Sequence, residues 1–199
     1  MTSSSHTEQF VKPQSANAHS LSHVFMGLGW CMKKVESAGF LGFGGGIQEV
    51  AVNLDGACLL FNKSGRLLDQ VCTGHLQSQC GAVVHSGNDA GGGGVDIENE
   101  RITVNLQHLP AAVETLVFTV TSAEEEPFAA IPHAFCLLVD AISDAELFRY
   151  DLTIEGDGYT ALIVAKLYRD GDAWKLQPIG ERAQARHHEE LAPLIQTYL

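Results

Sequence analysis

The chain has 199 residues, 45% of them hydrophobic and 18% charged, which is typical of a soluble globular protein with one domain and one core. Its net charge is −12, and only 12 Lys and Arg residues are spread through it. This balance argues against a nucleic-acid-binding protein, because phosphate contacts need clustered basic side chains. An acidic surface of this kind suits cations better.

No stretch approaches the roughly 18 apolar residues of a membrane span, and no basic region followed by an apolar one opens the chain. The sequence therefore predicts no membrane span and, by default, a cytoplasmic protein. The cysteines are odd in number and lack Cys-x-x-Cys spacing, which predicts reduced thiols rather than a zinc site or a disulfide framework. They are Cys31, Cys58, Cys72, Cys80 and Cys136.

Residues 1–20 are rich in Ser, His and Gln and predict a flexible N-terminal tail. From Leu21 the character changes, and residues 24–32 predict a strand that enters the core. Gly27 and Gly29 within it indicate close approach of another backbone. The glycine-rich residues 39–46 predict a mobile loop.

Residues 50–61 alternate as a strand does, with one apolar face and Asn53 and Asp55 on the other face. The apolar face comprises Val50, Val52, Leu54, Cys58 and Leu60. A turn at Asn62–Gly65 then predicts a hairpin with residues 66–71.

Further short strands follow, separated by Gly, Pro and Asp turns, and residues 75–85 are less regular. The expected strands are residues 102–107, 116–121, 134–139, 147–152, 160–168 and 174–176. This pattern predicts a mainly β fold, a two-sheet β-sandwich spanning residues 21–182. Residues 183–199 predict a C-terminal amphipathic α-helix that packs on it, since four apolar residues share helical spacing there. They are Leu191, Leu194, Ile195 and Tyr198.

The stretch from His85 to Val104 joins four glycines to acids and amides before it becomes a strand. Calcium prefers six to eight oxygen ligands, and glycine permits the sharp backbone angles that crowded coordination needs. Continuing the strand alternation backward places Asp96, Glu98 and Glu100 on one side. The pattern therefore predicts a calcium site, with Asn99 and Glu100 behind its ligands. The candidate ligands are Asn53, Asp55, Asn88, Asp89, Asp96 and Glu98. The alternative is that these are ordinary polar residues of turns and strand ends.

Other chemistry finds less support in the sequence. The glycine run lacks the Gly-Lys-Ser/Thr of a phosphate-binding loop, and neither a Gly-x-Ser-x-Gly elbow nor a cysteine-protease signature occurs. His75, His85, His108 and His133 show no motif spacing and predict surface or hydrogen-bonded histidines. The pair His187–His188 falls on the polar side of the expected helix. The sequence thus predicts no enzyme.

The order of motifs resembles the TerD family, the tellurium-resistance and stress-response domain, over about residues 21–182. Six segments carry the resemblance, and a Trp-Lys pair at Trp174 continues it to Gly180. They are Gly27–Trp30, Val52–Ala57, His85–Asp89, Val95–Glu100, Arg149–Leu152 and Thr160–Arg169. Membership would imply a β-sandwich that binds calcium at one end through acidic loops. It would also imply a role in bacterial resistance to tellurite and other stresses, with no established catalytic activity.

The resemblance also implies the residues of the site, and this chain departs from the family pattern at several of them. Asn53 and Asp55 fall on the family's Asp-Leu-Asp, Asn88 and Asp89 on its Gly-Asp-Asn, and Asp96, Glu98, Asn99 and Glu100 on its Gly-Asp-Gly-Asp-Asp-Glu. Asn53, Asn88, Asn99 and Cys31 each stand where the family has Asp, and Val95 and Ile97 replace two glycines. These losses of charge and flexibility predict one weakened calcium site or none.

Three functions are therefore carried forward. The leading one is a non-enzymatic stress-response protein whose partners are a weakly bound calcium ion and proteins of a stress-response complex. The second is a metal-free structural or interaction module of such a complex. The third is thiol chemistry on tellurite or other oxidants through Cys31, Cys72 or Cys80.

Overall fold

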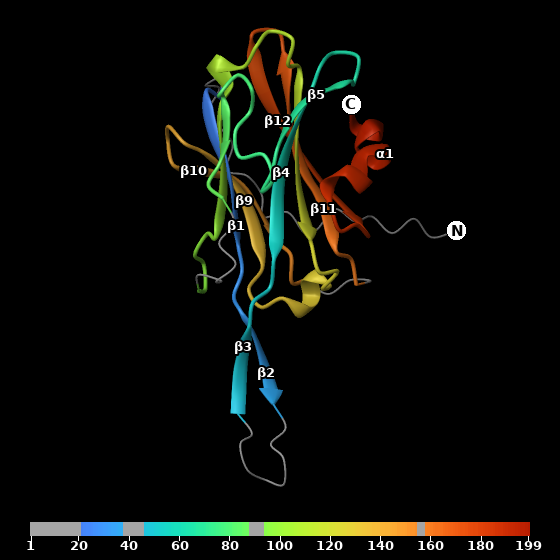
Figure 1. Cartoon of the computed structure of the whole chain (residues 1–199). Coiled ribbons are helices and arrows are strands. Elements are labelled where there is room, and N and C mark those ends of the chain that lie inside the picture. Colours follow the sequence, from blue (N-terminus) through green and yellow to red (C-terminus); the bar gives the residue numbers. More distant parts are fainter. Residues whose placement is uncertain (1–20, 38–45, 88–93, 155–157) are drawn as a thin grey trace, which may run out of the picture.

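The chain folds as two packed five-stranded sheets with a two-stranded hairpin projecting from one end (Figure 1). The computed structural model describes residues 21–37, 46–87, 94–154 and 158–199. The predicted tail of residues 1–20 and residues 39–45 of the predicted loop lie outside these ranges. The predicted β-sandwich is confirmed.

The first sheet is antiparallel, and β1 lies at its centre because it pairs with both β7 and β9. Val24, Met26 and Leu28 of β1 point into the core, and the residues between them face outward. From edge to edge the strands are β10 (Ala145–Asp151), β9 (Phe135–Asp140), β1 (His23–Gly29), β7 (Glu100–Asn105) and β6 (Val83–His85).

The second sheet is also antiparallel and contains the predicted hairpin after residue 61. Its strand β4 alternates as predicted, because Leu54, Cys58 and Leu60 lie in the core between the sheets. Asp55 shares the opposite face of the strand with Ala57. From edge to edge the strands are β12 (Ala173–Ala183), β11 (Ala161–Asp170), β8 (Thr115–Ser122), β4 (Leu54–Phe61) and β5 (Leu67–Val71).

Between β1 and β4 the chain leaves the sandwich as a hairpin of β2 (Lys33–Ser37) and β3 (Gly46–Val50), which we call the arm (Figure 1). The arm joins the central strand of one sheet to a strand of the other, and the end from which it projects is the arm end of the sandwich. The prediction of one strand over residues 50–61 is wrong at its start, because Val50 pairs with Lys33 in the arm.

Two smaller clusters flank the core that lies between the sheets. On the outer face of the first sheet, Phe135, Leu137 and Val139 pack with Phe25. On the outer face of the second sheet, apolar side chains of β4, β8 and β11 pack against the C-terminal segment. The C-terminal segment therefore partly covers the outer face of the second sheet, whereas the outward side chains Arg101 and Thr103 of β7 in the first sheet are exposed.

The C-terminal segment packs on the second sheet as predicted, with a shorter helical part. β12 continues to Ala183, and the helical residues are the 3-10 turn η3 (His188–Leu191), α1 (Ala192–Ile195) and the 3-10 turn η4 (Gln196–Tyr198). The four side chains that predicted this contact all lie in the cluster with Ala57. In the described part of the chain, no helix is long and apolar enough to cross a membrane.

Candidate functional site

The acidic segment before β7 forms a turn at the arm end. The backbone N–H of Ile97 donates to the carbonyl oxygen of Gly94 at 3.3 Å, and Asp96 has a φ of 60°. β7 begins only at Glu100, and the chain bends at Asn99, so the strand alternation does not extend back from Glu100 to Glu98. The prediction that Glu98 shares a side with Glu100 is therefore wrong, and the two carboxylates point to opposite faces of the first sheet.

Glu98 lies on the outer face of the first sheet, where Gly27 makes room for it. A Cβ atom at Gly27 would fall 2.6 Å from the Cδ atom of Glu98, so the predicted close approach at this glycine is made by a side chain. Arg101 holds the Glu98 carboxylate, with its Nη2 and Nε atoms 2.7 and 2.9 Å from Oε2. The Arg101 guanidinium also stacks 4.0 Å from the ring centroid of Phe25.

A second guanidinium, that of Arg149, carries positive charge near this acidic turn. The pKa of Arg149 is raised, first by its hydrogen bonds to Glu146 and further by the charges of Asp96 and Glu98. The carboxylates of Asp96 and Glu98 are thus accompanied by the two guanidiniums of Arg101 and Arg149. A cation that binds these carboxylates meets positive charge beside them, which lowers its affinity.

Asn99 and Trp30 fix the root of the arm to the interior. Asn99 Oδ1 accepts a hydrogen bond of 2.9 Å from the backbone N–H of Trp30, and Trp30 Nε1 donates to the carbonyl oxygen of Val52 at 2.8 Å. The Trp30 side chain is fully buried. The chain segments that enter and leave the arm are therefore tied to each other and to the acidic turn.

Glu100 and His85 form a buried pair between the sheets, with exposed fractions of only 2% and 3%. Glu100 Oε2 accepts a hydrogen bond of 3.0 Å from the backbone N–H of Gly56 in the second sheet. His85 Nδ1 accepts from the Gly87 N–H at 2.9 Å, so the neutral ring carries its proton on Nε2, which lies 3.4 Å from Glu100 Oε2. Burial raises the pKa of Glu100, and its contacts with His85 and Gly56 oppose that rise.

Sequence reasoning missed this pair, although a signal was present. Glu100 is in phase with Ile102 and Val104, whose side chains point inward, and a carboxylate at such a position needs a buried partner. The Glu100 side chain connects the first sheet to β4 of the second. It thereby fixes the position of the strand that follows the acidic turn.

Asp55 lies on the outer face of the second sheet, near the C-terminal segment. Its Oδ1 atom accepts a hydrogen bond of 2.8 Å from Thr73 Oγ1. It lines a depression of about 590 Å³ together with Cys72, Thr121 and residues 187–190. His188, predicted on the polar side of a helix, is buried here, and burial lowers the pKa of its ring.

The structure does not bring the described candidate ligands together. Asp96 and Glu98 lie beside the first sheet, whereas Asp55 lies on the outer face of the second, across the sandwich from Glu98. Asn53 stands just before β4, and its carbonyl oxygen accepts from the Ala123 N–H at 3.3 Å. Within the described ranges, no three His, Cys, Asp or Glu side chains have metal-binding geometry. The other two candidates, Asn88 and Asp89, lie outside these ranges.

The family model described as the TerD domain matches residues 11–198, nearly the whole chain. The chain belongs to the TerD family. Tellurium resistance protein TerZ of Serratia marcescens is 37% identical to this TerD-family chain over 179 residues, which are 89% of each protein. Stress response protein SCP2 of Bacillus subtilis is 32% identical over 183 residues, which are 86% of this chain and 88% of that protein.

A solved structure supports the TerD fold. A homologue of telluride resistance protein (TerD) from Streptomyces coelicolor A3(2) superposes with a TM-score of 0.69 at 18% identity, covering 86% of this chain and 95% of the other. The resemblance inferred from the motif order is thus confirmed. The calcium ligands that it implied remain a prediction.

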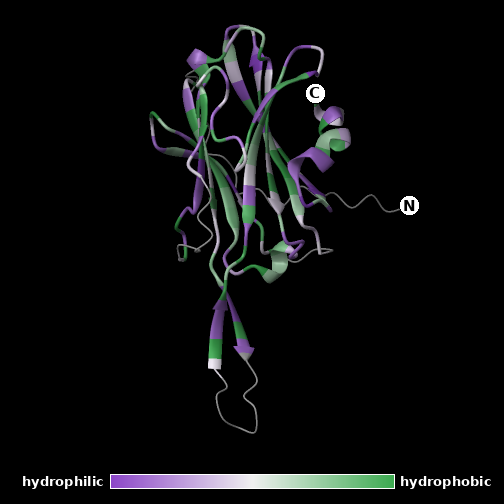
Figure 2. Cartoon of the chain, viewed as in Figure 1, coloured by the Kyte–Doolittle hydropathy of each residue, from purple (hydrophilic) through white to green (hydrophobic). Residues whose placement is uncertain are grey.

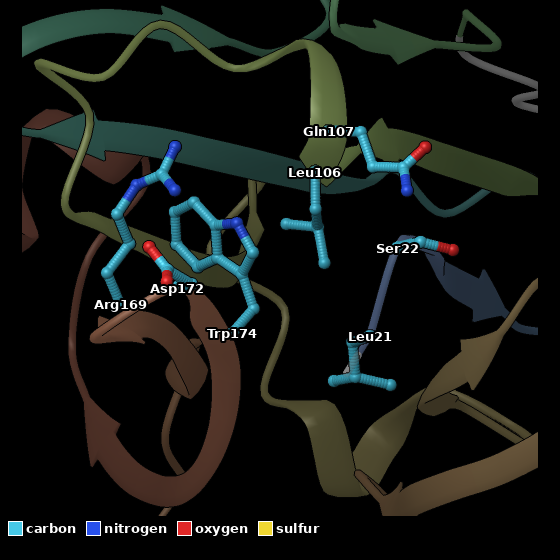
Figure 3. A pocket seen from close by; sticks show the side chains of 7 residues that line it. All are labelled: Leu21, Ser22, Leu106, Gln107, Arg169, Asp172 and Trp174. Atoms are coloured by element: carbon cyan, nitrogen blue, oxygen red, sulfur yellow. The ribbon is translucent and has the colours of Figure 1, made fainter. Parts of the chain in front are cut away.

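One TerD motif segment has a structural role at the end of the sandwich opposite the arm. Figure 3 shows Arg169 beside Trp174, with its guanidinium 4.6 Å from the ring centroid, and Arg169 Nε donates to the carbonyl oxygen of Val113 at 2.9 Å. The adjacent pocket holds about 200 Å³, which is below the usual range for small-molecule sites. It is lined by Leu21, Ser22, Leu106, Gln107, Arg169, Asp172 and Trp174.

The five cysteines of this TerD-family chain are all free and differ sharply in exposure. Cys58 and Cys136 are buried, and burial raises the pKa of both thiols. Cys80 is exposed, whereas Cys31 and Cys72 are partly exposed. Thiol chemistry is therefore open to the three cysteines that the sequence singled out and closed to the two in the core.

A thiol reagent should resolve these classes in the native protein. We expect Ellman's reagent to react fast with Cys80, more slowly with Cys31 and Cys72, and with Cys58 and Cys136 only after unfolding, because the buried thiols are neither accessible nor ionised. Absorbance at the wavelength of the released thiolate gives the three phases. The Cys80→Ser variant should lose the fast phase alone, and a fast phase that survives in it would contradict the assignment.

Proposed function

We propose that this TerD-family chain is a non-enzymatic, cytoplasmic stress-response protein that binds calcium with low affinity at the arm end of its sandwich. Relatives of similar length are named for tellurium resistance and for stress response. Five unpaired cysteines suit a reducing compartment. The proposed role needs no reaction at the site, only a change in stability or contacts when the ion binds.

The observation that carries the calcium proposal is the turn from Gly94 to Glu98. It holds the exposed Asp96 carboxylate two residues before Glu98, and calcium is a hard cation that prefers such oxygen ligands. Arg101 already pairs with Glu98, and the charges of both acids raise the pKa of Arg149. The ion must compete with these guanidiniums, which is the reason to propose a low affinity.

Thermal unfolding in calcium tests this proposal. Calcium at ten times its dissociation constant should stabilise the protein by about 1.4 kcal/mol, which raises the Tm by about 4 °C. Asp96→Ala should abolish the rise. Arg101→Gln should strengthen binding, because it frees the Glu98 carboxylate.

The control is Asp144→Ala, because Asp144 is also an exposed aspartate at a positive φ, 56°, in the turn between β9 and β10. It should keep the full calcium response. Titration calorimetry without heat at millimolar calcium would rule the calcium proposal out.

A metal-free interaction module is the second candidate. The ion pair between Glu98 and Arg101 favours it, since the carboxylate is already neutralised within the chain. Under this function the protein binds a partner of a stress-response complex equally well in calcium and in chelator. Loss of partner binding in chelator would favour the calcium-dependent function instead.

A further inference from the structure

The arm exposes apolar side chains that a two-stranded hairpin has no means to bury alone. Val35, Ile47 and Val50 have exposed fractions of 41%, 69% and 44%, and every residue of β3 is exposed. Figure 2 shows mainly hydrophilic strands in the arm with a hydrophobic band in β3. A lone hairpin is marginally stable in water, so a further contact would stabilise this one.

The outer edge of β2 is the natural place for that contact. Among the described residues, β2 pairs only with β3, so its other edge presents unpaired backbone N–H and C=O groups. Such an edge is a template for a strand of another chain. Natural proteins often block exposed edges with charge, and the charges of β2 decide which strand it accepts.

The sequence of β2, Lys-Lys-Val-Glu-Ser, is complementary to itself. When two copies pair antiparallel with Val35 opposite Val35, each Lys34 lies opposite Glu36 of the second copy. Opposite charges facing each other across strands stabilise a sheet. Pairing through β3 around Gln48 instead places Ile47 opposite Glu49, which has no such match. We propose that two copies of this chain pair through their β2 edges and join their arms into one four-stranded sheet.

Charge also favours the arm over the rest of the surface as the meeting point. The described arm carries two lysines and two glutamates and has no net charge, whereas the whole chain carries −12. Because the arm projects from the sandwich, contact through it keeps the two acidic bodies apart. The twofold pairing is closed, so it produces dimers and no filaments.

The interface is small, and this sets the expected affinity. Two five-residue strands with their side chains bury less than the roughly 1,200 Å² of a stable complex, so the dimer belongs to the weak, transient class. We expect the dimer to have a dissociation constant between about 10 µM and 1 mM. Val35 and Val50 of both copies lie on one side of the joined sheet, since each pair of opposite residues shares a side.

Charge-reversal variants test the pairing, because each one alone places like charges opposite one another. In a dimer of the Lys34→Glu variant two glutamates face each other across the β2 strands, and in a dimer of the Glu36→Lys variant two lysines do. Within its own arm Glu36 lies opposite the uncharged Ile47, so Glu36→Lys sets no like charges opposite each other there, whereas Lys34→Glu also places a glutamate opposite Glu49 of the same arm. Each variant alone should dimerise about 30-fold more weakly than the unmodified chain. An equimolar mixture should recover dimers, since both cross-strand pairs are then of opposite charge.

Analytical ultracentrifugation over the stated concentration range measures this, with Lys63→Glu as the matched control. Lys63 is exposed in the turn after β4, so its variant should dimerise as the unmodified chain does. Equal melting temperatures would show that the arm variants fold. The proposal is overturned if the unmodified chain stays monomeric throughout, if the arm variants dimerise normally, or if their mixture stays monomeric.

Discussion

Gly29→Ala should lower the free energy of unfolding by about 3 kcal/mol, at the upper end of what overpacking a core costs. A Cβ atom at this position would fall 2.5 Å from the carbonyl oxygen of Ile97 and 2.5 Å from the Phe135 ring. The first is backbone of the acidic turn, and the second is a nearly buried side chain of β9. Neither can move without displacing a strand or the turn, so the strain is not relieved. Urea denaturation measures the loss.

Two other glycines calibrate this result. Gly27→Ala meets the flexible side chain of Glu98 and should cost only about 1 kcal/mol, because the carboxylate can rotate away from Arg101. Gly74→Ala has nothing within 4 Å of the added Cβ atom and should be nearly neutral. If Gly29→Ala proved as mild as Gly74→Ala, the close packing of β1 against the acidic turn would be disproved.

Glu100→Ala should also destabilise the protein by about 3 kcal/mol. It removes the acceptor of the buried Gly56 N–H, an unsatisfied group that costs about 1–3 kcal/mol, and it opens a cavity beside the His85 ring. Glu100→Gln keeps an uncharged acceptor of the same shape. Since burial raises the pKa of Glu100 and so disfavours its charge, this variant should cost about 1 kcal/mol.

Guanidinium denaturation measures the free energy of unfolding of these variants and of Glu98→Ala. Glu98 lies two residues before Glu100, in a partly exposed ion pair with Arg101. That change should cost less than about 1 kcal/mol, as surface ion pairs do. A loss for Glu98→Ala as large as for Glu100→Ala would mean that the two carboxylates are not divided between surface and interior as the structure has them.

Strand alternation predicted the sandwich well because most strands are long enough to show a period. The inward face of β4 and the outward position of Asp55 followed from it, and so did the strand containing Ile102. It failed just before β7, where the chain is not a strand and bends at Asn99, so that Glu98 and Glu100 fall on opposite faces of the sheet. No pattern of apolar residues reports a bend directly before the first residue of a strand.

The arm and the C-terminal segment show two other reasons for failure. In β2 and β3 both faces are exposed, so neither strand shows the apolar periodicity that marks a half-buried strand. At the C-terminus the helical spacing correctly identified the contact residues, but pairing of Ala183 with Ala161 extends β12 where a helix was expected. Sheet hydrogen bonding there overrides local preference, and sequence periodicity alone does not reveal it.

Because Trp30 is fully buried at the arm end, its fluorescence can report on this end of the sandwich. The chain has only two tryptophans, and Trp174 lies under Arg169 at the other end of the sandwich. A protein with Trp174 changed to Phe keeps one indole, hydrogen-bonded to Val52 and beside the backbone that leads into the arm. The wavelength of its fluorescence emission and its quenching then report whether water reaches the root of the arm. This measurement follows the change in real time and needs no attached dye.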